Sequence, residues 1–292
     1  MDKLIYEQII KKKEFSQLPR KDVEIAFSHF EKRQVSEVEK IRLTRELLHK
    51  VFGAFLSSKL LNKKIINKKT TEEILKKHLS TKERFEFYLK LYKKIFYDSN
   101  EKVSVIDLGS GINGLSYNFI KKSLILSHPL THEIASLRSD IDEDINNLKN
   151  SKVINLKKNR ANVNEREKLE NKKINYIAVE SVGQLVELIN YYFIGGEIKN
   201  AKAIHLSLFE LEKLKILIDE QKGKKIIFLF KVIDSLEMLE RDYSKKLLRE
   251  IVNLSDVEKV VVSFATKSLV SKKSFKAKRY WFENFVKEEF NL

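Results

Sequence analysis

Residues 103–117 read VSVIDLGSGINGLSY, and this stretch decides the fold that we expect. Its short apolar run predicts a strand, the glycines that follow predict a sharp turn, and the residues after them predict the start of a helix. Three of the chain's eight glycines, Gly109, Gly111 and Gly114, fall in this turn. Glycine allows a tight turn and a close approach of a ligand to the backbone. The stretch therefore predicts a strand–turn–helix unit that can bind a ligand.

Further apolar runs follow at residues 174–180, 202–208, 225–232 and 257–265, and helical periodicity separates them at 184–193, 211–221 and 243–252. Strands that alternate with helices form a mostly parallel sheet covered on both faces. Residues 121–173 fit this alternation poorly because they are strongly polar, so we interpret them as a charged insertion between the first and second strands. The sequence thus predicts an α/β domain over residues 100–292.

Residues 1–99 read as helical throughout. Thr71 is expected to cap one short helix, to about residue 78, and Ser80 or Thr81 the next, which runs to about Tyr97. The segment holds 24 Lys and Arg against 14 Asp and Glu, a formal charge of +10 out of +16 for the whole chain. Such an excess indicates a polyanionic partner, most often nucleic acid, or else a Lys-rich coding bias. We expect residues 1–99 to form a small, basic, helical domain; the family resemblance described below implies that this domain docks RNA.

The composition excludes several classes of protein. The chain has no Cys, which excludes disulfides, thiolate zinc sites, iron–sulfur clusters and a Cys nucleophile, and fits a reducing cytoplasmic location. It has neither the apolar run of a membrane span nor that of a signal peptide. The six His are scattered, so no metal site is predicted, and no Ser–His–Asp or paired-carboxylate motif stands out. We expect a monomer with no membrane partner.

The order Asp107-x-Gly109-x-Gly111 is typical of S-adenosylmethionine sites in Rossmann-like methyltransferases. It differs from the dinucleotide G-x-G-x-x-G and from the phosphate-binding loop that ends in Gly-Lys-Ser/Thr. Glu180 ends the next strand, where an acid commonly accepts hydrogen bonds from the ribose hydroxyls of an adenosine cofactor. A turn without a ligand and an exposed strand-end Glu are the alternatives. Lys231 interrupts an apolar run, so either its charge is paired or reaches a site at the strand's end, or the side chain extends its charge to solvent.

Basic residues also cluster near the end of the chain, just before Tyr280, Trp281 and Phe282. Lysines beside aromatic residues are typical of RNA contact surfaces, although these aromatic residues fit better as core anchors of a last helix. The lysines that we predict to contact RNA phosphates are Lys50, Lys59, Lys82, Lys267, Lys272, Lys273 and Lys276.

Taken together, these stretches resemble a family, the aminoglycoside-resistance methyltransferases of 16S ribosomal RNA known as the Arm/Rmt type. The resemblance covers most of the chain outside 121–173. It rests on VEKIRLTRELLHKVFGAFLSS (38–58), HLSTKER (78–84), VSVIDLGSGINGLSY (103–117), IIFLFKVIDSLE (226–237) and VVSFATKSLVSKKSFKAKRYWFENF (261–285). The second block is similar to the family's H-x-S-T-x-E-R, and the last to its S-F-P-[TI]-[RK]-S-L, Gly/Lys-rich loop and W-F-E.

The resemblance implies a Rossmann-like S-adenosylmethionine domain behind an N-terminal helical RNA-docking domain, and methyl transfer to N7 of a guanine. It implies that Arg84 meets the cofactor's carboxylate, that Glu180 holds the ribose and that Lys231 lies beside the cofactor. The other implied cofactor residues are Asp107, Gly109, Gly111, Asn113, Ser207 and Leu208. No residue is assigned to acid or base catalysis, because guanine N7 has a free lone pair and needs only alignment with the methyl group.

The chain departs from the family at several positions. Gly114 replaces a Pro, Ser110 a Cys, Ala265 the Pro of S-F-P and Glu180 an Asp, and no acid is evident on the third strand. The chain also stops at Leu292, where the family continues into a last β-hairpin, so either it is truncated or its sheet is smaller. The alternatives are therefore the same chemistry on tRNA or another structured RNA, or an RNA-binding protein without turnover on a methyltransferase fold.

Overall fold

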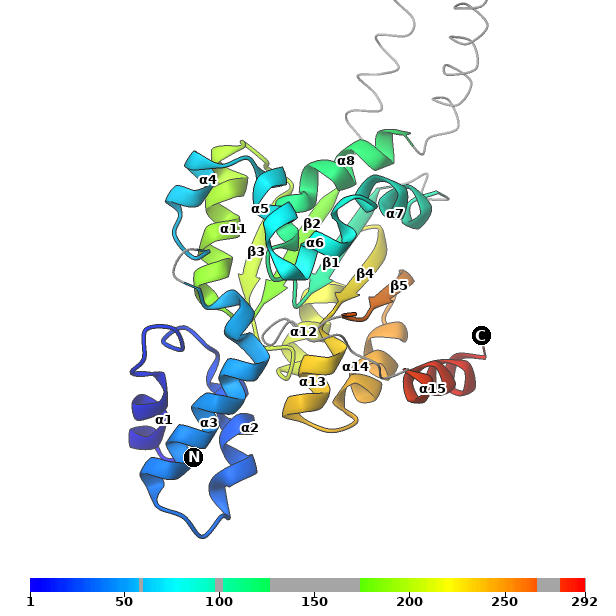
Figure 1. The fold of residues 1–292 in the computed structure, drawn as a ribbon. Coiled ribbons are helices and arrows are strands. Elements are labelled where there is room, and N and C mark those ends of the chain that lie inside the picture. The colour runs from blue at the N-terminus through cyan, green and yellow to red at the C-terminus, as the bar shows by residue number, and fades with distance from the viewer. Residues whose placement is uncertain (58–59, 98–101, 127–173, 267–278, 292) are drawn as a thin grey trace, which may run out of the picture.

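A parallel five-stranded sheet forms the centre of the molecule (Figure 1). The computed structural model describes residues 1–57, 60–97, 102–126, 174–266 and 279–291. The strands are β1 (Val103–Leu108), β2 (Asn175–Glu180), β3 (Ala201–His205), β4 (Lys224–Phe230) and β5 (Val257–Ser263), in the order β3-β2-β1-β4-β5. Every neighbouring pair is parallel. The expected α/β fold is confirmed, and the strands lie where the apolar runs predicted them.

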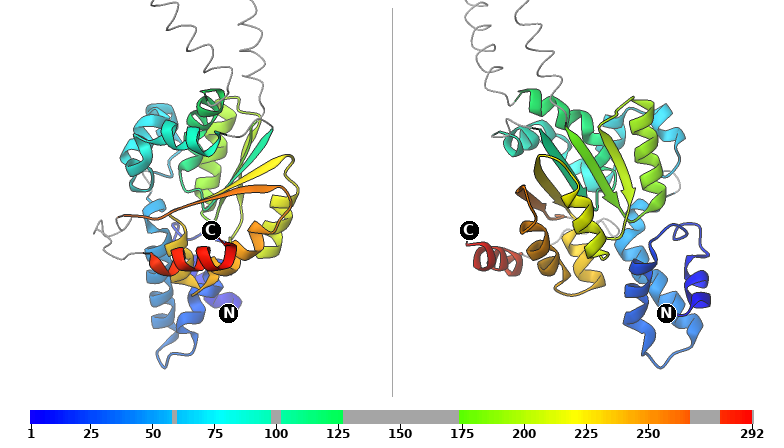
Figure 2. Two further views of the ribbon diagram at one scale, coloured as in Figure 1. Left: turned by 90° about the vertical axis from the view of Figure 1, so that its right-hand side faces the viewer. Right: turned by 180° about the vertical axis from the view of Figure 1, so that it is seen from behind.

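Helices cover both faces of the sheet, which explains why all of β1 and all but the first residue of β4 are buried and why most of these residues are apolar. Helices α8 (Tyr117–Leu126) and α11 (Gly183–Gly195) pack on one face, and α12 (Leu211–Asp219) and α14 (Tyr243–Val252) on the other (Figure 2). Right-handed crossovers require this arrangement. Among the described residues β5 is an edge strand, and α15 (Tyr280–Phe290) follows it in the chain. Of the predicted insertion, the structure describes only residues 121–126, which end α8.

The first three helices form a lobe beyond the carboxyl ends of the strands (Figure 1). This N-terminal lobe consists of α1 (Lys3–Ile10), α2 (Arg20–Glu31) and α3 (Glu37–Phe52). Its apolar faces meet each other, and α2 and α3 also pack against α13 (Ile233–Leu239) of the sheet domain. No described helix is long and apolar enough to cross a membrane.

The helices after the N-terminal lobe belong to the core around the sheet. The chain runs through η1 (Gly53–Phe55) and α4 (Lys64–Lys68) into α5 (Thr71–Lys77), α6 (Leu79–Phe85) and α7 (Tyr88–Ile95). Helix α7 packs on α8, and α5 packs on η2 (Asn113–Ser116), which directly precedes α8. Residues 1–99, which we expected to form one helical domain, therefore pack in two places: α1 to α3 form the N-terminal lobe, and α5 and α7 pack around the sheet. The domain boundary at residue 99 stays a prediction.

The expected helix caps are wrong by one or two residues. Thr70, not Thr71, caps α5, and it forms a reciprocal capping box with Glu73. His78 caps α6, because its Nδ1 accepts a hydrogen bond from the Ser80 backbone N–H over 3.2 Å. Burial lowers the pKa of His78, which favours the neutral ring that can accept this bond. The expected long helix to Tyr97 is also interrupted, since α6 ends at Phe85 and α7 starts at Tyr88.

The strand order locates a crevice. From β1 the chain adds β2 and β3 on one side, and it then crosses to add β4 and β5 on the other side. At such a switch point the loops after neighbouring strands diverge, so the carboxyl ends of β1 and β4 leave space for a ligand.

Candidate functional site

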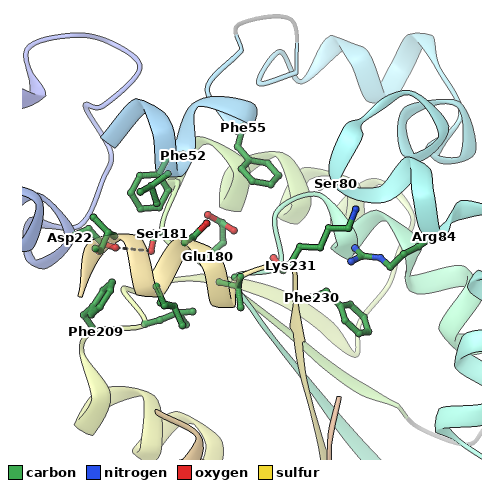
Figure 3. Close-up of a pocket in the computed structure, with 18 residues that line it drawn as sticks. Asp22, Phe52, Phe55, Ser80, Arg84, Glu180, Ser181, Phe209, Phe230 and Lys231 are labelled. Atoms are coloured by element: carbon green, nitrogen blue, oxygen red, sulfur yellow. Dashed lines mark hydrogen bonds between the residues drawn. The ribbon is translucent and has the colours of Figure 1, made fainter. Parts of the chain in front are cut away.

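A cleft lies at this switch point, between the carboxyl ends of the strands and the N-terminal lobe (Figure 3). It encloses about 700 Å³, counted to its open mouth. The loops after β1, β2, β3 and β4 supply one side, and the ends of α2 and α3, η1 and α6 supply the other. In Figure 3, Asp22 and Phe209 lie at one end of the cleft, and Arg84 and Lys231 lie at the other end. Glu180 lies between these two ends.

The glycine turn after β1 forms the floor of the cleft. Gly109 and Gly111 have φ angles of +66° and +54°, a backbone conformation that side chains disfavour. The backbone N–H groups of Gly109 and Ser110 both donate to Val179 O on β2, at 2.9 and 3.1 Å, which fixes the turn to the sheet. A Cβ on Gly109 would lie 2.5 Å from Val232 Cγ2, so the turn also has no room for a side chain.

Glu180, at the end of β2, is held by the same turn. Its Oε2 accepts a hydrogen bond from the Gly111 backbone N–H over 2.8 Å, and its Oε1 accepts one from the Val182 backbone N–H over 2.9 Å. Burial raises the pKa of Glu180, and these backbone donors offset part of that rise. Each carboxylate oxygen retains a further lone pair, so Glu180 can accept hydrogen bonds from a neighbouring pair of ligand hydroxyls.

Arg84 and Lys231 give the far end of the cleft a positive charge. The Arg84 guanidinium stacks on the Phe230 ring at 4.7 Å, and its Nη2 donates to Asn113 Oδ1 over 3.4 Å. Its Nε and Nη1 are buried and have no hydrogen-bond partner among the described residues. Buried donors of a charged group are costly to leave unpaired, so this end can take an anion such as a carboxylate.

Lys231 lies beside Arg84 and resolves the alternatives that its sequence left open. Its Nζ is buried and lies 2.5 Å from Glu83 Oε2, so its charge is paired and does not extend to solvent. Burial lowers the pKa of Lys231, and the Glu83 carboxylate counteracts the effect. Its φ of +60° is unusual for a residue with a side chain, and a bond from its backbone N–H to Ser263 O holds it there. Such local strain is common at functional sites.

A buried network of hydrogen bonds around Asn113 fixes the position of Arg84. Asn113 Oδ1 accepts a hydrogen bond from Tyr88 Oη over 2.9 Å, and Asn113 Nδ2 donates to Asp107 Oδ2 over 2.7 Å. Asp107 Oδ2 also accepts a hydrogen bond from Tyr176 Oη over 2.6 Å. Burial raises the pKa of Asp107. Asp107 and Asn113 therefore lie beneath the cleft and orient the residues that line it.

The other end of the cleft is mostly apolar, and it contains one acid from the N-terminal lobe. Asp22, in the first turn of α2, is only 2% exposed, and its Oδ1 accepts a hydrogen bond from Ser181 Oγ over 3.4 Å. Burial raises the pKa of Asp22 to about 7, although the hydroxyls of Ser207 and Ser181 counteract the rise. The sequence analysis missed this residue, since an acid in the first turn of a helix is ordinarily an exposed partner of the helix dipole.

The structure brings most of the expected cofactor residues together. Arg84, Gly109, Glu180, Leu208 and Lys231 line the cleft, whereas Gly111 does not line it and instead donates its backbone N–H to Glu180. Ser207 lies behind the apolar end, where its Oγ accepts a hydrogen bond from the Phe209 backbone N–H over 3.1 Å. Within the described residues, no group of three or more His, Asp or Glu side chains is placed to hold a metal ion.

The expected RNA-contacting lysines are described only in part. Lys50 lies exposed on α3 and Lys82 lies exposed on α6. Lys59, Lys267, Lys272, Lys273 and Lys276 lie outside the described residues.

Comparison with known proteins identifies the fold. No protein-family model matches the chain, and no curated protein matches its sequence. The 16S rRNA methylase RmtB has a similar structure, with a TM-score of 0.59 and 16% identity over 96% of this chain and 87% of that one. The 16S rRNA methyltransferase RmtF, solved in complex with S-adenosyl-L-homocysteine, gives 0.58 and 16% over 98% and 90%. An rRNA methylase from Escherichia coli gives 0.54 and 15% over 96% and 88%. The resemblance found in the sequence is thus confirmed for the fold.

Proposed function

Because the chain has the fold of 16S rRNA methylases, we propose that it is an S-adenosylmethionine-dependent methyltransferase of ribosomal RNA, and that it methylates N7 of a guanine in the small-subunit RNA. A fold hosts many functions, so the chemistry of the cleft must carry the proposal. The observation that carries it is the pair of buried donors on Arg84, Nε and Nη1, that have no hydrogen-bond partner among the described residues. Arg84 lines a cleft whose other regions also suit parts of the cofactor.

The cleft fits the cofactor in three successive regions. Arg84 and Lys231 suit the carboxylate of the methionine part, and a guanidinium can bind it with two parallel hydrogen bonds. Glu180 suits the ribose hydroxyls. The apolar end, lined by Phe52, Leu208 and Phe209, suits the flat face of adenine.

The bound cofactor supplies a methyl group on a positively charged sulfur, which a nucleophile can displace. The side chains of this chain orient that group: Arg84 fixes one end of the cofactor and Glu180 its middle, while the turn at Gly109 leaves its backbone open to close approach. Guanine N7 would attack the methyl carbon with its free lone pair while the bond from that carbon to the sulfur breaks, and the neutral thioether would leave. No proton is released, so no general base is required. Alignment of the reactants and exclusion of water account for the catalysis that we propose.

The RNA side of the proposal rests on charge. Residues 1–99 carry a formal charge of +10, and Lys50 and Lys82 are exposed on that part of the chain. Lysines of this kind bind phosphates without reading the base sequence. The charge therefore supports a structured RNA substrate, and the choice of small-subunit RNA rests on the similar proteins alone.

The decisive experiment offers several RNAs at once. The protein is incubated with methyl-labelled S-adenosylmethionine and, separately, with small ribosomal subunits, naked 16S rRNA and tRNA, and strand cleavage specific for N7-methylguanine then locates the label. We expect label at one guanine of the small-subunit RNA, and none with an Arg84→Ala variant. Label in tRNA alone would refute the target, and cofactor binding without label in any RNA would mean a binding protein without turnover.

A further inference from the structure

The N-terminal lobe contributes a wall of the cleft, and this wall contains an acid that the proposed function has not used. Asp22 comes from α2, and Phe52 and Phe55 come from the end of α3 and from η1. All three line the same cleft as Glu180 and Leu208 of the sheet domain. In Figure 3 Asp22 lies at the end of the cleft remote from Arg84, close to Ser181, Phe52 and Phe209.

One oxygen of the buried Asp22 carboxyl group lacks a partner among the described residues, at an end of the cleft that is mostly apolar. Its Oδ2 is buried and has no hydrogen-bond partner among the described residues, whereas its Oδ1 accepts one long bond from Ser181 Oγ. The side chains around it include Phe52, Phe209 and Leu239. A buried carboxyl oxygen without a partner destabilises the protein, so its position is best explained by a ligand that donates a hydrogen bond to it.

Among the described residues of the sheet domain that line the cleft, Glu180 lies further along it and no acid lies at this end. The residues after β3 read Leu206-Ser207-Leu208-Phe209, so neither this strand nor the turn after it supplies an acid up to Phe209. Ser207 lies near Asp22, since its hydroxyl lowers the pKa of Asp22. The Asp22 carboxyl group, which belongs to α2 of the N-terminal lobe, thus lies near the end of β3.

We propose that Asp22 selects adenine at this end of the cleft, by accepting a hydrogen bond from the exocyclic amine of the base. The inference rests on the proposed function, because it assumes that an adenosine cofactor lies along the cleft with its carboxylate at Arg84. A flat, apolar slot with one acceptor at its end distinguishes a base that carries an amine from one that lacks it. Asp22 is then a specificity residue supplied by the N-terminal lobe.

The test combines two ligands with two proteins. S-adenosylhomocysteine is compared with its analogue that carries hydrogen in place of the adenine amine, on the wild type and on Asp22→Ala, with affinities from calorimetry. At a pH above about 7, where Asp22 has lost its proton in the folded protein, we expect the wild type to prefer the amine by about tenfold or more, the weight of one hydrogen bond to a charged group. We expect Asp22→Ala to lose that preference, because both ligands then meet the same apolar wall. A preference retained by Asp22→Ala would overturn the proposal.

A matched control lies on the same helix. Glu24 pairs with Arg20 over 2.7 Å and does not line the cleft, so Glu24→Gln is expected to keep the wild-type preference. If Asp22→Ala fails to fold, the wild type alone still decides, because equal affinities for the two ligands would overturn the role of Asp22. Failure of both ligands to bind the folded wild type would instead refute the proposed function.

Discussion

Replacement of Arg84 by Lys tests the proposed carboxylate contact, because it keeps the charge and removes the fork of donors. In the structure the guanidinium is fixed by Phe230 at 4.7 Å and by Asn113 Oδ1 at 3.4 Å, and its Nε and Nη1 remain for a ligand. A lysine ammonium at this site has a single charged centre and cannot form two parallel bonds to one carboxylate.

The magnitude follows from the donors that are lost. A hydrogen bond to a charged group contributes about 1.5–3 kcal/mol, and Lys retains the Coulomb attraction, so the net loss is about one such bond. We therefore expect Arg84→Lys to weaken binding of S-adenosylhomocysteine about 10- to 150-fold. Isothermal titration calorimetry measures this change, with the melting temperature of each variant as a check of folding.

Arg33 offers a matched control for Arg84. It is exposed outside the cleft and also stacks on an aromatic ring, that of Phe30 at 4.8 Å, so Arg33→Lys is expected to leave cofactor affinity unchanged. RNA binding without cofactor should change little in Arg84→Lys. If Arg84→Lys keeps its cofactor affinity and loses RNA affinity, Arg84 belongs to the RNA surface and the reasoning is wrong.

Three further expectations concern the turn, the surface charge and the buried acid. Gly111→Val should abolish binding of S-adenosylhomocysteine, because the residue has a φ of +54° and a Cβ would lie 2.7 Å from Phe55 Cε1; unchanged calorimetric affinity would contradict this. RNA affinity should fall with salt, and Lys50→Ala and Lys82→Ala should each reduce the slope of log K against log salt by about 0.7–0.9; a flat dependence in the wild type would refute phosphate docking. The folded protein holds a proton on Asp22 up to about pH 7, against an ordinary pKa of 3.8, so the free energy of unfolding should fall as pH rises through that window. The decrease in the free energy of unfolding between the ordinary pKa and about pH 7 is expected to be on the order of 4 kcal/mol, and the Asp22→Asn variant should not show it. Identical pH profiles of the two proteins in denaturant melts would exclude the raised pKa of Asp22.

The sequence predicted those parts of the site that depend on neighbouring residues. The strand before Asp107, the glycines of the turn and the acid at the end of β2 are each visible in a few consecutive residues, and the structure has them at one edge of the sheet. Arg84 followed from the resemblance of a short block, and it does line the cleft. Its expected helix was wrong, because a His cap and the interruption before Tyr88 depend on contacts with η1 and with the sheet domain.

Asp22 could not be predicted in the same way. Its neighbours Val23, Ala26 and Phe27 indicate an amphipathic helix, and an acid at its start fits the exposed side of any such helix. It is buried only because α2 packs across the carboxyl ends of strands that lie more than a hundred residues further along the chain. No local pattern reports such a contact.

The wall that α2, α3 and η1 contribute to the cleft has a consequence for how this protein can be dissected or re-engineered. A truncation that removes these helices would open the cleft as well as remove basic surface, so it could not assign a loss of the proposed activity to RNA docking alone. Exchange of the same helices for those of a relative would replace part of the cleft wall together with the basic surface. If RNA holds the lobe against the sheet domain, then each ligand must change the affinity of the other by the same factor. The two halves of this protein would then be expected to evolve as a matched pair and not as interchangeable modules.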